Sequence, residues 1–276
     1  MGVLNVTPDS FFDGGRFHHE EPSLLIDKAV KQGLILIQEG AHYLDIGGES
    51  SRPGATPVSL EEELRRVIPV IRNIHRECPQ TIISVDTIKP QVAEEALRNG
   101  ASIINDIRGF RDPDMLSVAA SQNAGICIMH MRGTPQTMQL GDLSSPDLVQ
   151  EVVRWLSTAV ERALKAGVSE HAISLDVGIG FGKTVEQNIE LIIRLEEVLA
   201  LGFPVLIGLS RKSMIGAITQ AKVEDRLPGS IAALLEAWRR GASIFRVHDV
   251  WESVQALQVT SHLDHFSKTL RGYSSP

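Results

Sequence analysis

Cysteine is almost absent from this sequence, with only Cys78 and Cys127 among 276 residues. They share no Cys-x-x-Cys spacing with each other or with a cluster of histidines. This pattern argues against both a disulfide framework and a structural zinc site. Free cysteines are typical of proteins in a reducing compartment, so we expect this protein in the cytoplasm.

Long hydrophobic runs and targeting signals are also missing. No uninterrupted apolar run approaches the roughly 20 residues that a membrane-spanning helix needs, so we expect no contact with a membrane. Residues 1–15 have neither the basic nor the long apolar region of a secretory signal. Because Met1 stands at the edge of an apolar run, we expect the chain to begin inside its first strand, without a few upstream residues.

Positive charge is in deficit, because 27 lysines and arginines stand against 34 aspartates and glutamates, for a net charge of −7. A protein that binds nucleic acid through its phosphates needs a basic surface. We therefore expect no nucleic-acid partner. If the substrate is an anion, the positive charge that holds it must be local to the site.

What the chain does contain is a regular alternation of short apolar runs and helical patterns. Hydrophobic residues make up 43% of it and charged residues 22%, as in a globular protein with a sizeable core. Helical spacing follows the apolar runs, for example over 24–39, 146–166, 184–200 and 231–240. The eight runs are GVLNV, HYLDI, TIISV, SIIND, GICIM, AISLD, PVLIG and SIFRV.

These runs are short, rich in Val, Ile and Leu, and apolar on both faces, as buried parallel strands are. No linker or low-complexity segment divides the chain. Eight strand–helix units in this length favour an α/β fold, a single (β/α)8 TIM barrel over residues 1–276, rather than a doubly wound sheet. In such a barrel the active site lies at the C-terminal ends of the strands.

The stretch Asp176–Thr184, DVGIGFGKT, looks at first like a phosphate-binding P-loop. That motif requires Gly, four residues and then Gly-Lys-Ser/Thr, and here Val177 stands where its first glycine should be. Thr184 and Gln187 instead fit a capping box at the start of a helix. We interpret Lys183 as an ordinary loop charge and exclude a nucleotide site.

Polar residues follow almost every predicted strand, where a barrel would bring them together. Taken alone, Asn5 can form a turn, His130 can be a satisfied core histidine, and Arg246 can pair with Asp249. A packed barrel end would not tolerate all of them without a ligand. The set comprises Asn5, Asp45, Glu49, Asp86, Asn105, Asp106, His130, Asp176, Ser210, Arg211, Lys212, Arg246 and His248.

The acidic members of this set also have simple explanations. Asp86 and Asp106 can each cap a helix or form a turn, and Asp45 can point outward from its strand end. As a whole, however, the set has two chemical characters, one suited to a flat, donor-rich heterocycle and one to a polyanion with a divalent metal. We therefore predict a ring that carries a phosphate arm. The first group is Asp86, Asn105 and Asp176, and the second is Asn5, Arg246 and His248, with nearby Arg52.

Eight longer blocks of sequence stand in order over residues 1 to about 250. They are MGVLNVTPDSFFDGG, LDIGGESSRPGATPVS, SVDTIKP, IINDI, MHMRGTP, DVGIGFGKT, IGLSRKS and FRVHDV. In number and order they resemble the signature blocks of the dihydropteroate synthase family, which are pterin-binding TIM barrels. A match of this extent is far more specific than any single motif.

The resemblance implies a transferase of folate synthesis, which joins 6-hydroxymethyl-7,8-dihydropterin diphosphate to 4-aminobenzoate and releases diphosphate and 7,8-dihydropteroate. It further implies a homodimer, sulfonamides as competitive inhibitors, and Mg²⁺ as cofactor near Asn5. The reaction would be a dissociative substitution, since a neutral arylamine needs no strong base. The catalytic residues implied are Lys212, Arg246, His248 and Asp86.

The resemblance also implies which residues contact each part of the substrates. Loops over 7–15 and 49–55 would close over the site. The pterin contacts would be Asp86, Asn105, Met129, Asp176, Gly208 and Lys212, and the diphosphate contacts Asn5, Arg246 and His248. The aminobenzoate contacts would be Ser51, Arg52, Pro53, Phe181 and Ser213.

The sequence departs from the family pattern at Val177, where proline is usual, and at Ser51, where threonine is usual. Both lie beside the substrate pockets, so we expect them to affect substrate affinity and sulfonamide response more than activity. A pterin-barrel methyltransferase and a non-catalytic pterin-binding paralogue stay open as alternatives. A Schiff-base aldolase is weaker, because Lys212 follows its strand rather than lying in an apolar strand pocket.

Overall fold

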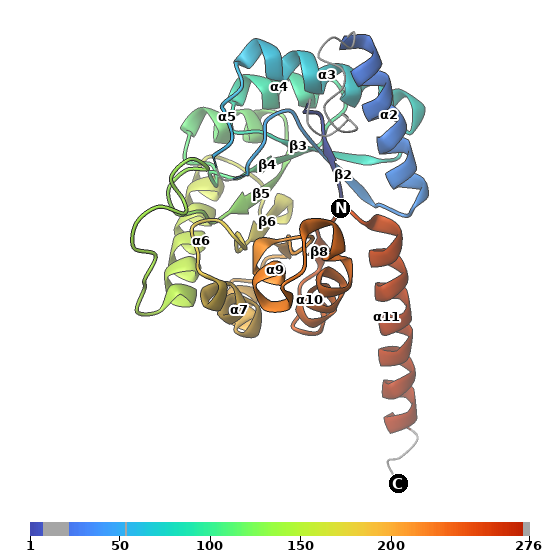
Figure 1. Ribbon diagram of the computed structural model, residues 1–276. Helices are drawn as coiled ribbons and strands as arrows, with labels where there is room; N and C mark the ends of the chain where they lie inside the picture. The colour runs from blue at the N-terminus through green and yellow to red at the C-terminus, as the bar shows by residue number, and fades with distance from the viewer. Residues whose placement is uncertain (8–21, 53, 273–276) are drawn as a thin grey trace.

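The barrel predicted from the sequence is present in the computed structural model, which describes residues 1–7, 22–52 and 54–272 (Figure 1). Eight parallel strands lie in sequence order in one sheet. Gly2 bridges Val247, and the Val3 N–H donates to the Val247 carbonyl at 3.0 Å, so the ends of the sheet meet and close it. The strands are β1 Gly2–Asn5, β2 Tyr43–Gly47, β3 Ile82–Asp86, β4 Ile103–Asp106, β5 Gly125–Met129, β6 Ile173–Asp176, β7 Val205–Ile207 and β8 Ile244–Phe245.

Helices connect successive strands and cover the outside of the barrel (Figure 1). Two short 3-10 helices, η1 Glu170–Ala172 and η2 Val223–Asp225, lie in the connections. The α-helices are α2 Pro22–Gln38, α3 Leu60–Glu77, α4 Pro90–Arg98, α5 Pro113–Ser121, α6 Leu148–Lys165, α7 Val185–Ile193, α8 Leu195–Leu199, α9 Ser213–Thr219, α10 Leu227–Arg239 and α11 Val250–Gly272.

Local sequence signals explain where several helices begin. Ser59 caps α3 by accepting a hydrogen bond from the Glu62 N–H at 3.2 Å, and glutamates fill the first turn, where the helix dipole favours them. Thr184 and Gln187 form the predicted capping box of α7. The threonine of the glycine run therefore has a structural role.

The helix expected over 184–200 is divided into two. Arg194 leaves the helical region of backbone space, with φ −102° and ψ 30°, so α7 ends before it and α8 begins after it. The Arg194 guanidinium pairs with carboxylates of α7, of α8 and of the residue that caps α6. These three ion pairs stabilise a bend that periodicity alone does not reveal.

The core fills the barrel and the layer between strands and helices. Ile46, Ile83 and Ile104 on the strands are completely buried, as are Val67 and Ile71 on α3. Burial of this apolar surface is the main favourable contribution to folding. Because it fixes the strands against the helices, the residues at the strand ends are held in a definite arrangement.

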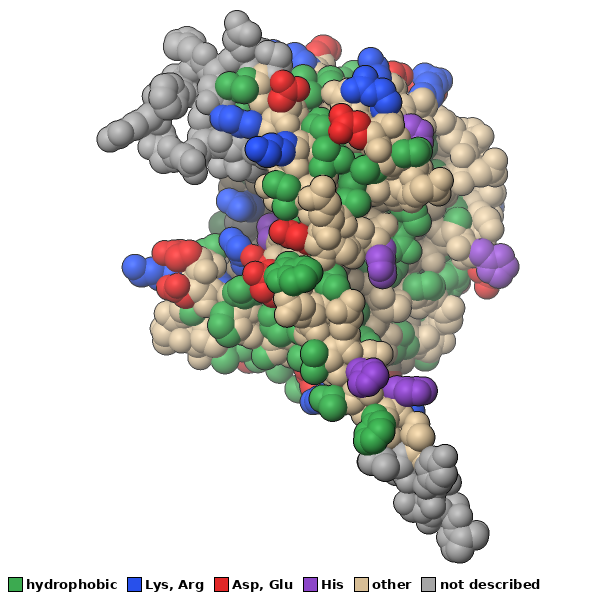
Figure 2. All heavy atoms as spheres, turned by 90° about the vertical axis from the view of Figure 1, so that its right-hand side faces the viewer, with side chains coloured by type: hydrophobic (Ala, Val, Ile, Leu, Met, Phe, Trp, Pro, Cys, Tyr) green, Lys and Arg blue, Asp and Glu red, His purple; other side chains and the backbone are tan. Residues whose placement is uncertain are grey.

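The last helix, α11, extends well beyond the barrel (Figure 1). Its first turns pack on the barrel through the buried Val250 and Ser253. Farther along, Val259, Leu263 and Phe266 are exposed, and Figure 2 shows hydrophobic side chains along this projecting end. Of the helices that the structure describes, none is long and apolar enough to cross a membrane.

The cap of α3 gives a test of the fold. We expect Ser59→Ala to lower the free energy of unfolding by about 1 kcal/mol, because the Glu62 N–H loses its acceptor. Urea denaturation measures this change. Ser117→Ala, at an exposed position inside α5, is the matched control and should cost nothing, since alanine favours helix. Equal stability of Ser59→Ala and the natural protein would contradict the cap.

Candidate active site

Arg246 lies at the centre of the polar residues that the strand ends bring together. It follows β8, and its Nε donates to Asp45 Oδ2 at 2.6 Å while its Nη2 donates to Asp86 Oδ2 at 2.9 Å. Asn105 Nδ2 donates to the same oxygen of Asp45 at 3.0 Å. Strands β2, β3, β4 and β8 thus contribute to one buried, charge-paired network.

Asp45 belongs to the predicted set of strand-end residues, but the sequence prediction assigned it no substrate contact. Its interpretation as an outward-pointing charge is wrong, because the side chain is completely buried in the middle of β2. Its Oδ1 has no hydrogen-bond partner among the described residues, although Oδ2 accepts two. The available signal was a single charged residue inside an otherwise apolar strand, a position where only a partner or ligand makes burial tolerable.

The simple alternative for Arg246, an ion pair with Asp249, is not what the structure shows. Arg211 takes Asp249 instead, with Nε donating to Oδ2 at 3.0 Å. The two arginines therefore have different functions: Arg211 closes the loop after β7 onto the start of α11, and Arg246 points inward to the acidic residues.

Burial shifts the pKa of two acidic groups of the site, Asp86 and Asp176. It raises the pKa of Asp86 to about 7, the carboxylates of Asp45 and Glu63 add to the increase, and Arg246 opposes it. Burial likewise raises the pKa of Asp176, although the Gly178 N–H, donating at 2.7 Å, favours its ionised form. For Arg246, burial alone would lower the pKa, but the two paired carboxylates raise it, so the guanidinium stays charged.

Lys212, which follows β7, and Phe181, in the glycine run, lie together on one side of the site. The Lys212 Nζ lies 4.4 Å from the centroid of the Phe181 ring, a cation–π distance. Burial lowers the pKa of Lys212 to about 8, and the nearby Asp176 opposes this decrease. A Cβ added to Gly180 would lie 3.6 Å from Lys212 Cδ, an ordinary van der Waals distance, so the lysine stem lies alongside this glycine. Ser213, the next residue, begins α9.

Met129 and Gly208 lie where the sequence prediction expected them, at or just after strand ends. Met129 is buried at the end of β5, in a small apolar cluster with Phe181 and Ile107. Gly208 directly follows β7, and an added Cβ there would meet only Arg246 Cβ, at 3.9 Å. Met129 therefore adds an apolar side chain to the strand ends, and Gly208 leaves the space beside Arg246 Cβ unfilled.

A cavity of about 260 Å³ opens beside this network. Ser51 and Asp86 both line it, which brings the loop after β2 to the end of β3, and Arg108 and Pro135 complete its far side. Arg52 is exposed in the same loop. Pro53 and residues 8–15, predicted to contribute to the site, lie outside the described residues.

His248 is held as a neutral donor rather than a cation. Its ring Nδ1 lies 3.0 Å from Ser210 Oγ, which also accepts the His248 backbone N–H at 3.2 Å. Either of these two atoms can be the donor, depending on the tautomer of the imidazole ring. Burial lowers the pKa of His248 to about 4, and the charges of Arg246 and Arg211 lower it further.

The glycine run contains a further correction. Lys183 is not a loop charge, because only 3% of it is exposed and its Nζ donates to three backbone carbonyls.

His130 is buried as predicted, edge-on to Trp155 at 5.3 Å, but its Nδ1 has no hydrogen-bond partner among the described residues. Burial lowers its pKa to about 2, so it stays neutral. Asp106 is a turn former, accepting from the Arg108 and Phe110 N–H groups.

The sequence prediction assigns one residue, Asn5, to a metal ion. Asn5 is half-buried at the end of β1. The described residues contain no group of three or more His, Cys, Asp or Glu side chains that could hold a metal ion. Mg²⁺ is commonly held by one or two protein oxygens together with substrate phosphates and waters. The Asn5 amide oxygen fits that arrangement, and a cage made of protein ligands does not.

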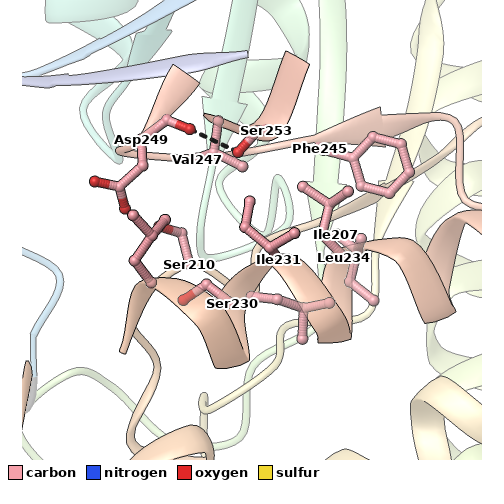
Figure 3. Close-up of a pocket in the computed structure, with 11 residues that line it drawn as sticks. Ile207, Ser210, Ser230, Ile231, Leu234, Phe245, Val247, Asp249 and Ser253 are labelled. Atoms are coloured by element: carbon pink, nitrogen blue, oxygen red, sulfur yellow. Dashed lines mark hydrogen bonds between the residues drawn. The ribbon is translucent and has the colours of Figure 1, made fainter. Parts of the chain in front are cut away.

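A second cavity, of about 10 Å³, lies between β7, β8 and α10 (Figure 3). Ile207, Phe245 and Leu234 surround it with apolar atoms. A single water needs about this much space, so it is a packing gap rather than a substrate pocket.

Comparison with known proteins agrees with this geometry. Residues 1–248 match the family model described as pterin binding enzyme. The dihydropteroate synthase of Escherichia coli K12 is 46% identical over 259 residues, which cover 94% of this chain and 89% of that protein.

Solved structures agree as well. The Xanthomonas albilineans dihydropteroate synthase with 4-aminobenzoic acid is 44% identical and superimposes with a TM-score of 0.87, covering 95% of this chain and 92% of that one. The Yersinia pestis dihydropteroate synthase, solved with a sulfonamide drug complex, is 39% identical with a TM-score of 0.88, covering 96% of this chain and 93% of that one.

The coupling between Asp45, Asp86 and Arg246 can be measured directly. We expect Asp45→Asn to lower the pKa of Asp86 below about 7, because a like charge disappears and Arg246 is left to Asp86. Carboxyl ¹³C NMR titration measures this pKa. Asp114→Asn, at an exposed position in the first turn of α5, is the control and should leave it unchanged. A constant or higher pKa in Asp45→Asn would show that the two carboxylates are not coupled.

Proposed function

The chain belongs to the dihydropteroate synthase family of pterin-binding enzymes, and from that membership we propose how its own residues bind the two substrates and join them. It is a transferase that condenses 6-hydroxymethyl-7,8-dihydropterin diphosphate with 4-aminobenzoate, giving 7,8-dihydropteroate and diphosphate. This membership decides against the methyltransferase and aldolase alternatives.

The pterin binds among the acceptors at the strand ends. Asp86, Asn105 and Asp176 come from β3, β4 and β6 and are almost completely buried. A pterin presents several N–H donors along one edge, which a buried carboxylate or amide oxygen can accept. Met129 and Gly208 leave room for the flat ring between them, and Lys212 contacts its edge. The convergence of these buried acceptors is the observation that carries the proposal.

The diphosphate binds at the other side of the strand ends, where Asn5, Arg246 and His248 lie. In the free protein Arg246 is paired with Asp45 and Asp86, so pterin binding to Asp86 makes the guanidinium available to the leaving group. The neutral His248 ring has one N–H that it can donate to the diphosphate. Asn5 would hold Mg²⁺ through its amide oxygen, and the bound ion would supply positive charge beside the diphosphate.

The aminobenzoate occupies the space bordered by Phe181, Ser213 and the loop of Ser51 and Arg52, with Pro53 in the same loop. A neutral arylamine is already a nucleophile, so no residue has to act as a strong base. We infer a dissociative substitution in which the C–O bond to diphosphate breaks first. The pterin ring delocalises the positive charge on its methylene carbon, and the amine nitrogen then forms the new C–N bond and loses a proton.

Several further properties follow from the family in the same way. We propose that sulfonamides compete with aminobenzoate, as the Yersinia pestis complex suggests, and that the protein works in the cytoplasm. We also propose a homodimer formed by helices away from the strand ends. Leu164 on α6 and Ile193 on α7 support this, because 40% and 48% of these apolar residues are exposed. Sedimentation equilibrium at micromolar concentration tests this assembly.

The role of Arg246 is tested by removing it. We expect Arg246→Ala to slow aminobenzoate-dependent diphosphate release by about 100-fold or more, because the leaving group loses its preorganised cation. A coupled assay for diphosphate, with dihydropteroate measured in parallel, gives the rate. Arg72→Ala, exposed on α3, is the control. Near-normal release by a folded Arg246→Ala would refute this role, and no release by the natural protein would indicate a non-catalytic paralogue.

Binding of the pterin should depend on pH through Asp86. Because the pKa of Asp86 is raised to about 7 and its ionised form is the acceptor, affinity should fall as the pH decreases below about 7 and level off above it. Calorimetric titration with 6-hydroxymethyl-7,8-dihydropterin, which lacks the titrating diphosphate, measures this between pH 5.5 and about 8. Asp86→Asn should bind weakly and without this dependence. A pH-independent affinity of the natural protein would contradict the assignment.

A further inference from the structure

Lys183 is a buried lysine whose partners are all backbone atoms. Its Nζ donates to the carbonyl oxygens of Gly178 at 2.8 Å, Phe181 at 3.0 Å and His130 at 3.2 Å. An ammonium group has three N–H donors and no acceptor, so this set of carbonyls satisfies it completely. In a P-loop the equivalent lysine would contact a nucleotide phosphate, whereas here it contacts its own loop.

The glycines of the run explain why these carbonyls need a donor. Gly178, Gly180 and Gly182 have φ of +68°, +84° and +68°, the left-handed region that favours glycine. A Cβ on Gly178 would lie 1.9 Å from the His130 carbonyl oxygen, so the run presses against the chain that follows β5. Three carbonyls converge on the Lys183 Nζ here, and the Gly178 carbonyl also accepts the Phe181 N–H at 3.1 Å.

The two ends of this arrangement carry groups of the active site. At one end the Gly178 N–H donates to Asp176 Oδ1 at 2.7 Å. At the other end the Phe181 ring lies 4.4 Å from the Lys212 Nζ. Asp176 is also fixed by its strand, whereas the backbone of Phe181 belongs to the loop and only its side chain packs elsewhere, against Met129 and Ile107.

We propose that Lys183 is a positioning residue for the condensation, which uses three backbone carbonyls to fix the loop 177–182 and thereby places Phe181 against the aminobenzoate. It contacts neither substrate. The inference rests on the proposed function only for the assignment of Phe181 to the aminobenzoate pocket.

The charged groups that face Lys183 come from four segments. Asp176 at the end of β6 and Glu151 on α6 favour its ammonium form, and Arg132 after β5 and Lys212 after β7 oppose it. Burial lowers its pKa to about 7. No ion pair within the described residues holds this side chain, so its hydrogen bonds to the loop are what fix it.

The test separates a positioning effect from a loss of folding. Lys183→Met keeps the length of the side chain and removes every donor, Lys183→Arg restores donors, and Lys165→Met is the control at an exposed position of α6. We measure KM for each substrate and kcat, together with thermal unfolding. The expected result is an increase of about tenfold in KM for aminobenzoate in Lys183→Met, a smaller increase for the pterin diphosphate, partial recovery in Lys183→Arg and no change in Lys165→Met.

Two outcomes would overturn the proposal. One is a folded Lys183→Met whose two KM values stay within twofold of the natural protein. The other applies if Lys183→Met does not fold, and it is an unchanged KM for aminobenzoate in Gln139→Ala. Gln139 Nε2 donates to the Gly180 carbonyl at 2.9 Å and supports the tip of the same loop from an exposed position. An increase of about threefold in KM for aminobenzoate in Gln139→Ala supports a loop held for this substrate, and an unchanged KM refutes it.

Failure of the proposed function would look different. In that case the natural protein itself would release no diphosphate in response to aminobenzoate, and no KM could be compared. A natural protein that is active, alongside Lys183 variants with unchanged kinetics, would leave the function intact and remove only the positioning role.

Discussion

The interaction on which the site depends is the guanidinium of Arg246 between the carboxylates of Asp45 and Asp86. Two acidic groups buried side by side would otherwise repel each other and lose their hydration, a cost that a shared cation offsets. Asn105 is oriented by the same carboxylate oxygen of Asp45. One arginine thus stabilises the free protein and holds the acceptor groups in place until a ligand replaces its contacts.

This arrangement divides the chemistry between two parts of the barrel. Asp45, Asp86 and Asn105 lie on β2, β3 and β4, whereas Lys212, Arg246 and His248 follow β7 and β8. A substrate with a donor-rich ring and an anionic arm matches that division. The neutral state of His248 reduces the positive charge that must be buried at the strand ends, and the lowered pKa of Lys212 shows that its ammonium group is less favoured there. Arg246 is left as the strongly charged group.

The sequence was sufficient for the barrel, because eight apolar runs separated by helical patterns leave few other folds. It also predicted the strand-end residues, since parallel strands bring their C-terminal ends together. The sequence could not predict which side chains form ion pairs, because closure of the sheet decides which of them meet. Asp249 lies near Arg246 in sequence, but in the folded protein it pairs with Arg211. The burial of Lys183 likewise follows from left-handed glycine geometry, which turns carbonyls inward and leaves no trace in residue spacing.

Closure of the barrel also sets an order of events during synthesis of the chain. Arg246 lies 201 positions after Asp45 and 160 after Asp86, and Val247 pairs with Gly2 at the opposite end of the sequence. Contacts of such separation form late and slow folding. While the ribosome still covers the last residues, a nascent barrel therefore has neither its final seam nor the cation for its acidic interior. Arg246 and Val247 thus complete both the wall of the barrel and the charge balance of its interior.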